Sequence, residues 1–233
     1  METNSLWFLE QIDVTTIFCP QKLGSGAMEN HTHKTFKKGE FIYIPKEQAD
    51  HIYLLSDGRV KIGAYGDGGK EITKAILNTG EVFGELSLIG AEKRRDFAYA
   101  MESTTVCIIT VDEMKSLMRE HNGLQLFMMK IMGNRVLEME QRLESLVFRD
   151  SRTRIIEYLL NLAKKKGQRV GYEVVVRRFL THQEIANLTA TSRQTVTTVL
   201  NELRGKNLIT FNRKRLLVRD VDALGKETAK QAS

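Results

Sequence analysis

Cysteine and long apolar runs are scarce in this sequence, and each shortage excludes a class of protein. The two cysteines, Cys19 and Cys107, have no CxxC spacing, so they supply neither a disulfide framework nor the four ligands of an iron–sulfur cluster. No stretch reaches the roughly 18 consecutive apolar residues that a membrane-spanning helix needs. The start, METNSLWFLEQ, lacks the basic region of a signal peptide. We therefore expect a cytoplasmic protein without a membrane partner, an iron–sulfur cluster or a bound metal.

Acidic residues are scarce in the last third of the chain. From Arg149 to the C-terminus there are 18 Lys plus Arg against 8 Asp plus Glu, a net charge of +10. The other 17 basic and 21 acidic residues leave residues 1–148 at −4, which agrees with the total of +6. A length of 233 residues allows two modest domains. The asymmetry predicts that the C-terminal domain binds a polyanion.

Glycine turns divide residues 33–111 into short segments. Their apolar patterns predict strands at 40–44, 51–56, 59–65, 71–77, 81–83, 97–100 and 105–110. Many short strands with glycine turns are typical of a small antiparallel barrel or jelly roll, which can enclose one small ligand. Ahead of this region, apolar residues within 1–18 predict a short docking helix.

Helical periodicity resumes at Val111, and residues 124–148 predict one long helix with no proline. Its apolar residues alternate steps of three and four, the spacing of a two-helix seam. The seam lies between heavily charged flanks, which favours a parallel homodimer; the alternative is a helix that packs on its own barrel. The residues expected at the dimer interface are Met129, Met132, Val136, Met139, Leu143 and Leu146.

The stretch THQEIANLTATSRQTVTTVLNEL, residues 181–203, predicts two short helices joined by a tight turn. Thr181 with Glu184 forms a capping-box pattern, and Ser192 can cap the second helix. Ala190 falls where a left-handed residue would be expected. The second helix is apolar on one side and carries Arg, Gln, Thr and Asn on the other, side chains that pair with base edges and phosphates. It therefore predicts a recognition helix; an ordinary helical hairpin is the alternative.

The surrounding segments complete a DNA-binding domain. A helix at 151–166 and a strand at 172–179 precede the two helices, and strands at 208–211 and 216–218 follow them. Asn212 is expected to supply the left-handed turn of this second hairpin. The hairpin has a basic tip suited to phosphates and predicts a wing. The last residues, from about Ala223, are expected to fray.

Three motifs together resemble the cyclic-AMP receptor protein and fumarate–nitrate reduction regulator (Crp/Fnr) family of bacterial transcription factors. They are THQEIANLTATSRQTVTTVLNELRGKNLI, GELSL at 84–88 and LESLVFRD ahead of Ser151. The resemblance covers nearly the whole chain and implies an α+β architecture. Its parts would be a cyclic-nucleotide-binding-like β jelly roll at 1–120, a long dimerisation helix and hinge at 121–150, and a winged helix–turn–helix at 151–233. The implied function is sequence-specific transcription regulation by a homodimer that binds a two-fold symmetric double-stranded operator and RNA polymerase, with no enzymatic activity.

The resemblance also assigns roles on the DNA. Residues that match Arg193, Gln194 and Thr198 face the bases, and those that match Thr181, His182, Gln183 and Ser192 face phosphates. Gln194 stands where the best-known member has an acid, which favours adenine or a water-bridged contact. The full expected set is Thr181, His182, Gln183, Ser192, Arg193, Gln194, Thr197, Thr198, Asn201 and Lys214.

For the effector, Gly84, Glu85, Leu86 and Arg95 match the pattern that holds a cyclic nucleotide in other members. Asp96, however, replaces a phosphate donor and would repel the phosphate by one to several kcal/mol at about 4 Å. Met139 and Glu140 replace the hydroxyls that hold adenine. A cyclic nucleotide is therefore possible but disfavoured, and the effector is unknown. An internal salt bridge of Glu85 with Arg94 or Arg95 in an empty barrel is the alternative.

Haem sensing, redox sensing and metal-dependent catalysis are alternatives to cyclic-nucleotide sensing. A haem-responsive regulator could use His31, His33, His51 or Cys19 as an axial ligand, although such residues are more often plain surface or strand residues. A redox-responsive or ligand-independent member of the same family is a further alternative. A cupin-type metal-binding enzyme would use His31 and His33, but it lacks a third histidine and leaves the basic domain unexplained.

Overall fold

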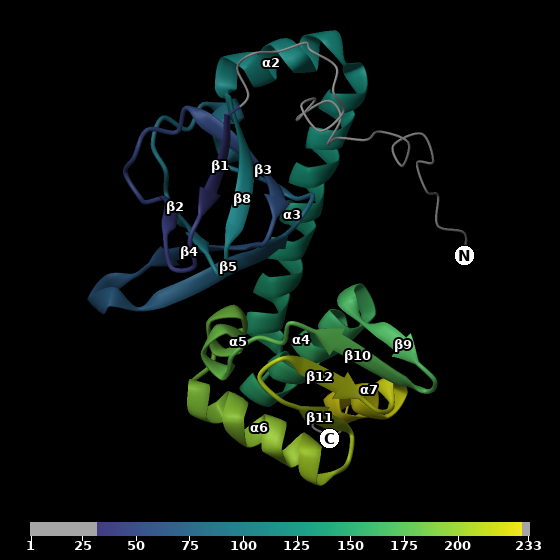
Figure 1. Cartoon of the computed structure of the whole chain (residues 1–233). Coiled ribbons are helices and arrows are strands. Elements are labelled where there is room, and N and C mark those ends of the chain that lie inside the picture. The colour runs from purple at the N-terminus through teal and green to yellow at the C-terminus, as the bar shows by residue number, and fades with distance from the viewer. Residues whose placement is uncertain (1–31, 230–233) are drawn as a thin grey trace. The chain divides into compact units, whose positions relative to one another are not determined.

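The computed structural model describes residues 32–229, and the chain separates into two compact units, Met1–Leu137 and Glu138–Ser233. Figure 1 shows the β-rich part of the first unit and the mixed second unit. The docking helix expected within 1–18 lies outside the described residues, as do Cys19 and His31.

The first unit is a double-sheet jelly roll, as predicted. One sheet has the strand order β1-β8-β3-β6 and the other β2-β7-β4-β5, and all their pairings are antiparallel. The elements are β1 (Thr32–Phe36), β2 (Phe41–Tyr43), β3 (His51–Asp57), β4 (Arg59–Tyr65), η3 (Asp67–Gly69), β5 (Glu71–Asn78), β6 (Val82–Phe83), η4 (Glu85–Ile89), β7 (Phe97–Ala100) and β8 (Thr104–Thr110).

Strand β3 is buried on both faces and so separates two apolar clusters. Tyr53 and Leu55 belong to the cluster between the two sheets, together with residues such as Phe83 and Val106. Ile52 and Leu54 point the other way, toward Met114 and Leu124 of the helices. This alternation follows from the two-residue period of a strand. The barrel is therefore packed inside by side chains and covered outside by helices.

Two helices follow the barrel in the chain, α2 (Val111–Glu120) and α3 (Asn122–Phe148). Helix α2 begins at a capping box in which Thr110 accepts from the Glu113 amide and the Glu113 carboxylate accepts from Thr110. Helix α3 has one apolar stripe on its own barrel, where Leu124 and Met128 are buried.

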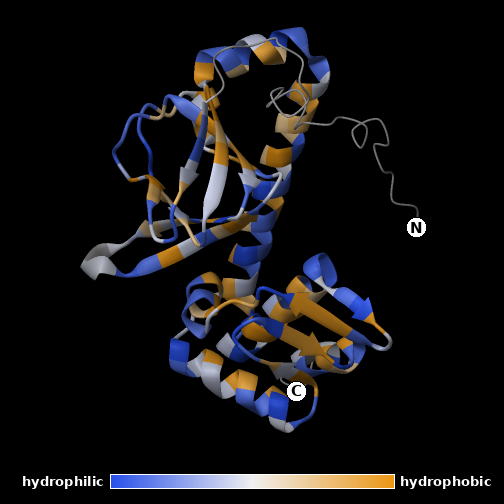
Figure 2. Cartoon of the chain, viewed as in Figure 1, coloured by the Kyte–Doolittle hydropathy of each residue, from blue (hydrophilic) through white to orange (hydrophobic). Residues whose placement is uncertain are grey.

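A second stripe of α3 is solvent-exposed in the single chain, and Figure 2 shows the mixture of hydrophobic and hydrophilic residues along this helix. It contains the predicted seam: Met132 is half-buried, and the other five members are exposed, namely Met129, Val136, Met139, Leu143 and Leu146. The helix therefore packs on its own barrel and also leaves the predicted dimer seam open.

The second unit is a winged helix–turn–helix. After the C-terminal part of α3 it contains α4 (Ser151–Lys166), β9 (Gln168–Val170), β10 (Glu173–Arg177), α5 (His182–Thr189), α6 (Arg193–Gly205), β11 (Ile209–Phe211), β12 (Arg215–Val218) and α7 (Val221–Ala229). Its sheet has the order β11-β12-β10-β9. Helix α4 packs on α5, α6 and α7, and its apolar side chains Ile155, Ile156 and Leu159 are fully buried.

The expectation that the chain frays from about Ala223 was wrong. Residues Val221–Ala229 form α7, whose Leu224 is fully buried and whose Glu227 is only 5% exposed. Burial of Leu224 and a bond from Arg152 to Glu227 hold the helix in place. The local sequence does not reveal the bond to Glu227, because Arg152 is 75 residues away.

Candidate nucleic-acid interface

The caps predicted for the two helices of the helix–turn–helix are confirmed. The Thr181 hydroxyl accepts from the Glu184 amide at 3.2 Å, and the Glu184 carboxylate accepts from the Thr181 amide at 2.7 Å. The Ser192 hydroxyl accepts from the Thr195 amide at 3.0 Å. Between them Ala190 has φ 50° and ψ 48°, the left-handed conformation expected at this turn. Local hydrogen bonds therefore set where each helix starts.

Two arginines outside the motif hold its turn. Arg154 of α4 donates to the carbonyl oxygens of Thr189 at 3.0 Å and Ala190 at 3.2 Å, and Arg142 of α3 donates to that of Asn187 at 3.3 Å. These carbonyls end α5, where the helix dipole favours a cation. Burial of the guanidinium lowers the pKa of Arg142. Sequence reasoning missed both arginines, because nothing local marks their acceptors.

Helix α6 has one buried and one exposed face, as its sequence predicts. Val196, Val199, Leu200 and Leu203 are buried. The exposed set that the structure brings together on the other face is Ser192, Arg193, Gln194, Thr198 and Asn201. Gln183 at the start of α5 is exposed as well. Side chains able to donate to and accept from base edges thus remain available to solvent.

The Thr197 hydroxyl is engaged by two partners within the protein. It donates to the Arg193 carbonyl oxygen at 2.9 Å and lies 2.8 Å from Nδ1 of His182. With the hydroxyl hydrogen directed at Arg193, Nδ1 of His182 must be the donor in that contact. Burial, and then the charge of Arg193, lower the pKa of His182. The pair connects the start of α5 to the middle of α6.

The hairpin of β11 and β12 is the predicted wing, but its turn forms differently. Asn212 has a negative φ, so the expected left-handed conformation was wrong. Instead its side-chain Oδ1 accepts from the amides of Lys214 at 2.8 Å and Arg215 at 3.0 Å. An asparagine that bonds the backbone two residues on is an established alternative for closing a turn. The turn leaves Arg213, Lys214 and Arg215 exposed at the tip.

An aromatic ring joins the wing to both helices. The Phe211 ring lies 5.7 Å from that of His182 and 6.3 Å from that of Phe179. The Arg204 guanidinium of α6 lies 5.2 Å from the same ring and donates to Oδ1 of Asn201 at 2.9 Å. Sequence reasoning did not single out Arg204 or Phe211.

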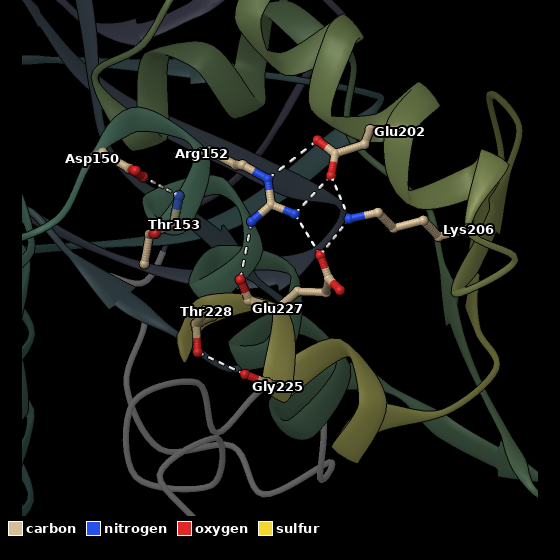
Figure 3. Close-up of polar contacts among 8 residues, drawn as sticks. All are labelled: Asp150, Arg152, Thr153, Glu202, Lys206, Gly225, Glu227 and Thr228. Carbon is tan, nitrogen blue, oxygen red and sulfur yellow. Dashed lines mark hydrogen bonds and ion pairs between the residues drawn. The ribbon is translucent and has the colours of Figure 1, made fainter. Parts of the chain in front are cut away.

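A charged network fixes the far end of the recognition helix (Figure 3). Arg152 of α4 donates to both carboxylate oxygens of Glu202 on α6, at 2.8 and 3.2 Å, and to Glu227 of α7 at 2.6 Å. Lys206 donates to Glu202 at 2.8 Å and to Glu227 at 2.7 Å. These hydrogen bonds lower the pKa of Glu202 to about 2. Helices α4, α6 and α7 are thereby joined near the C-terminal end of α6.

The candidate effector residues of the barrel have a different arrangement from the one expected. Glu85 forms an ion pair with Arg135 of α3, which also donates to the Val82 carbonyl oxygen at 2.6 Å. The expected salt bridge of Glu85 with Arg94 or Arg95 was therefore wrong. Arg94 instead donates to the Gly84 carbonyl oxygen at 3.1 Å and to that of His51. Glu85 is thus paired with an arginine of α3, and Arg94 is bound to main-chain carbonyl oxygens instead of the Glu85 carboxylate.

The other effector candidates are spread more widely. Arg95 and Leu86 are exposed, and Asp96 forms an ion pair with Lys74 at 3.0 Å. Gly84 has φ 79°, and a Cβ there would lie 3.0 Å from Nη1 of Arg94. The glycine therefore serves the close approach of the buried Arg94. Met139 falls in the second compact unit and is exposed.

Residues 32–229 contain no group of His, Cys, Asp and Glu arranged to hold a metal ion. Cys107 is buried in the cluster between the barrel and its helices, and Nδ1 of His51 lies 2.6 Å from a carboxylate oxygen of Asp50. No helix in this described part of the chain is long and apolar enough to cross a membrane.

Comparisons with known proteins agree with this architecture. Residues 33–121 match the family model of the cyclic nucleotide-binding domain, and residues 153–227 match that of the Crp-like helix-turn-helix domain. The global nitrogen regulator of Synechocystis sp. is 31% identical, over 89% of this chain and 92% of that protein. The CRP-like cAMP-activated global transcriptional regulator of Mycobacterium tuberculosis is 27% identical, over 82% and 85%.

Solved structures give the same result. A mutant of CooA from Carboxydothermus hydrogenoformans matches with a TM-score of 0.77 and 25% identity, covering 98% of this chain and 97% of that one. A CRP-family transcriptional regulator from Thermus thermophilus matches with a TM-score of 0.69 and 29% identity, over 84% and 96%. Members of this family are transcription regulators that bind DNA as dimers. By motif, fold and similarity over most of its length, the chain belongs to the Crp/Fnr family of transcription regulators.

Proposed function

We propose that this regulator reads base edges with Arg193, Gln194, Thr198 and Asn201, and holds phosphates with Thr181, His182, Gln183, Ser192 and Lys214. The observation that carries the proposal is the exposed polar face of α6 beside a basic wing, in the part of the chain with net charge +10. Thr197, with its hydroxyl engaged by Arg193 and His182, positions the helix rather than contacting a base.

Selection of bound sequences from a random DNA pool tests this division of roles. The wild type should enrich two half-sites about one helical turn apart, because a symmetric dimer reads them. Arg193→Ala should abolish the preference among bases, whereas Lys214→Ala should weaken binding to all sequences and reduce its salt dependence. If both variants changed base preference equally, the assignment of roles would be wrong.

The dimer is proposed to form through the exposed seam of α3, in a chain divided into a barrel at 1–120, a helix and hinge at 121–150 and a DNA-binding domain at 151–233. Leu143 is 63% exposed and Met139 is 71% exposed in the single chain, a cost that a partner helix would remove. Leu143→Glu should yield monomers in analytical ultracentrifugation, while Glu144→Gln on the flank should leave the dimer intact. A dimeric Leu143→Glu variant would contradict the assignment.

We propose further that the barrel does not hold cyclic AMP in the manner of the cyclic-nucleotide-binding members. The Glu85 carboxylate is engaged by Arg135, Asp96 replaces a phosphate donor, and Arg95 is exposed. Isothermal calorimetry with cyclic AMP and cyclic GMP tests this, and micromolar or tighter binding by the wild type would overturn it.

RNA polymerase is proposed as the partner at the promoter, which transcription assays with and without an enriched operator would test.

A further inference from the structure

The side-chain amide of Asn201 is exposed, but its orientation is restricted by a neighbouring arginine. Its Oδ1 accepts from Nη2 of Arg204 at 2.9 Å, one helical turn further along α6. A guanidinium has only donors, so the amide atom that faces Arg204 must be the oxygen. The remaining hydrogen-bonding capacity of the amide toward solvent is dominated by its two N–H donors.

Arg204 is itself held in place from the other side. Its guanidinium lies over the Phe211 ring of β11, 5.2 Å from the ring centre. The ring contacts Phe179 and His182 and is therefore fixed by the body of the domain. Stacking and a charge-assisted hydrogen bond act on the same planar group, which reduces its freedom to leave Asn201.

The restriction matters because an asparagine must present different amide atoms to adenine and to guanine. An asparagine that reads adenine uses its oxygen to accept from N6 and its nitrogen to donate to N7. Guanine offers two acceptors, N7 and O6, at the same edge. Arg204 occupies one of the two lone pairs of Oδ1 and fixes the direction of the amide, so the amino group of adenine meets only an acceptor that is already shared, whereas the two acceptors of guanine still meet donors.

We infer that Arg204 is a specificity-determining positioning residue, which makes Asn201 a donor and turns its preference from adenine to guanine. Arg204 acts through Asn201, and the effect is confined to the one base pair of each half-site that Asn201 faces. The inference rests on the proposed role of α6 in base reading.

Random-pool selection with the full-length protein tests it. The wild type should enrich guanine at one position of each half-site, and Arg204→Met should lower the guanine-to-adenine ratio there by roughly tenfold, the scale of one good base contact. Arg215→Met is the matched control, because it removes an equal charge from the wing tip. It should lower affinity at all sequences and leave the ratio unchanged.

Two further variants separate positioning from charge and from folding. Arg204→Lys keeps the charge but loses the planar fork, so it should shift the same ratio with a smaller loss of affinity. In an Asn201→Ala background, Arg204→Met should leave the guanine-to-adenine ratio at that position unchanged. Thermal unfolding of each variant checks that the domain is intact.

An unchanged ratio in Arg204→Met would overturn the inference and make Arg204 a plain phosphate contact. A shift that persists without Asn201 would overturn it as well. These results differ from failure of the proposed function, in which the wild type itself enriches no symmetric sequence; the inference would then fall with the function on which it rests.

Discussion

Arg135 on the long helix forms an ion pair with Glu85 of the barrel, although the two residues are 50 positions apart in the sequence. The carboxylate is buried, with 7% of its side chain exposed, while 32% of the arginine side chain remains accessible. Arg135 also donates to the Val82 carbonyl oxygen at 2.6 Å. The pair attaches α3 to the start of η4 (Glu85–Ile89) in the barrel.

Because Glu85 is the buried partner, removal of its cation should be the more damaging change. Arg135→Met leaves a buried carboxylate without its cation and should lower the free energy of unfolding by about 2–3 kcal/mol. Glu85→Gln leaves a solvated arginine and should cost about 1 kcal/mol. Urea unfolding of the full chain, followed by circular dichroism, measures both values.

The double variant supplies the control for this asymmetry. Glu85→Gln with Arg135→Met should be more stable than Arg135→Met alone, since the stranded charge is gone. Lys165→Met breaks the exposed pair with Glu138 and should cost no more than about 0.5 kcal/mol. Equal losses of unfolding free energy in Arg135→Met, Glu85→Gln and Lys165→Met would show that Glu85 gains little stability from Arg135.

Ala190 occupies a left-handed conformation that costs a residue with a Cβ roughly 1 kcal/mol. Ala190→Gly should therefore raise the free energy of unfolding by about 0.5–1 kcal/mol, and Arg154 should keep its bond to the same carbonyl. Ala223→Gly, within helix α7, is the control and should lower it by about 1 kcal/mol. Thermal unfolding that ranks the two variants the other way would contradict the strain assignment.

Glu202 gives the second unit a pH dependence with a defined sign. Its pKa falls from 4.5 to about 2 in the folded protein, chiefly through the hydrogen bonds from Arg152 and Lys206. A depressed carboxyl pKa stabilises the fold above the unfolded value, and that contribution is lost as pH falls from about 4.5 toward 2. Glu202→Gln should lower the melting temperature at pH 7, and the gap to wild type should close over this range.

The control for this pH dependence is Glu173→Gln, which changes a carboxylate of the same unit outside the network. Its gap to wild type, measured over the same pH range, gives the effect of removing a carboxylate that Arg152 and Lys206 do not contact. A pH-independent gap for Glu202→Gln would mean that packing, rather than ionisation, accounts for its effect.

These cases show which parts of the molecule the sequence could predict. Features decided within three or four residues were predicted well, among them the caps at Thr181 and Ser192 and the backbone of Ala190. Strand β1 was missed because its residues are exposed except Phe36, so they carry no alternation. The partners of Glu85 and Glu227 were missed because Arg135 and Arg152 reach them only through the tertiary fold.

The wing offers a last test in which the sequence and the structure predict opposite results. If Asn212 served the turn by a left-handed backbone, Asn212→Gly would preserve or improve it. In the structure φ is negative and Oδ1 accepts two amide bonds, each worth about 1 kcal/mol. Asn212→Gly should therefore loosen the tip, raise the amide exchange rates of Lys214 and Arg215 and weaken DNA binding several-fold. Asn212→Asp retains the acceptor and should keep the exchange rates near those of wild type. If the glycine variant protected the two amides equally well, the side-chain bonds of Asn212 would not be what closes the turn.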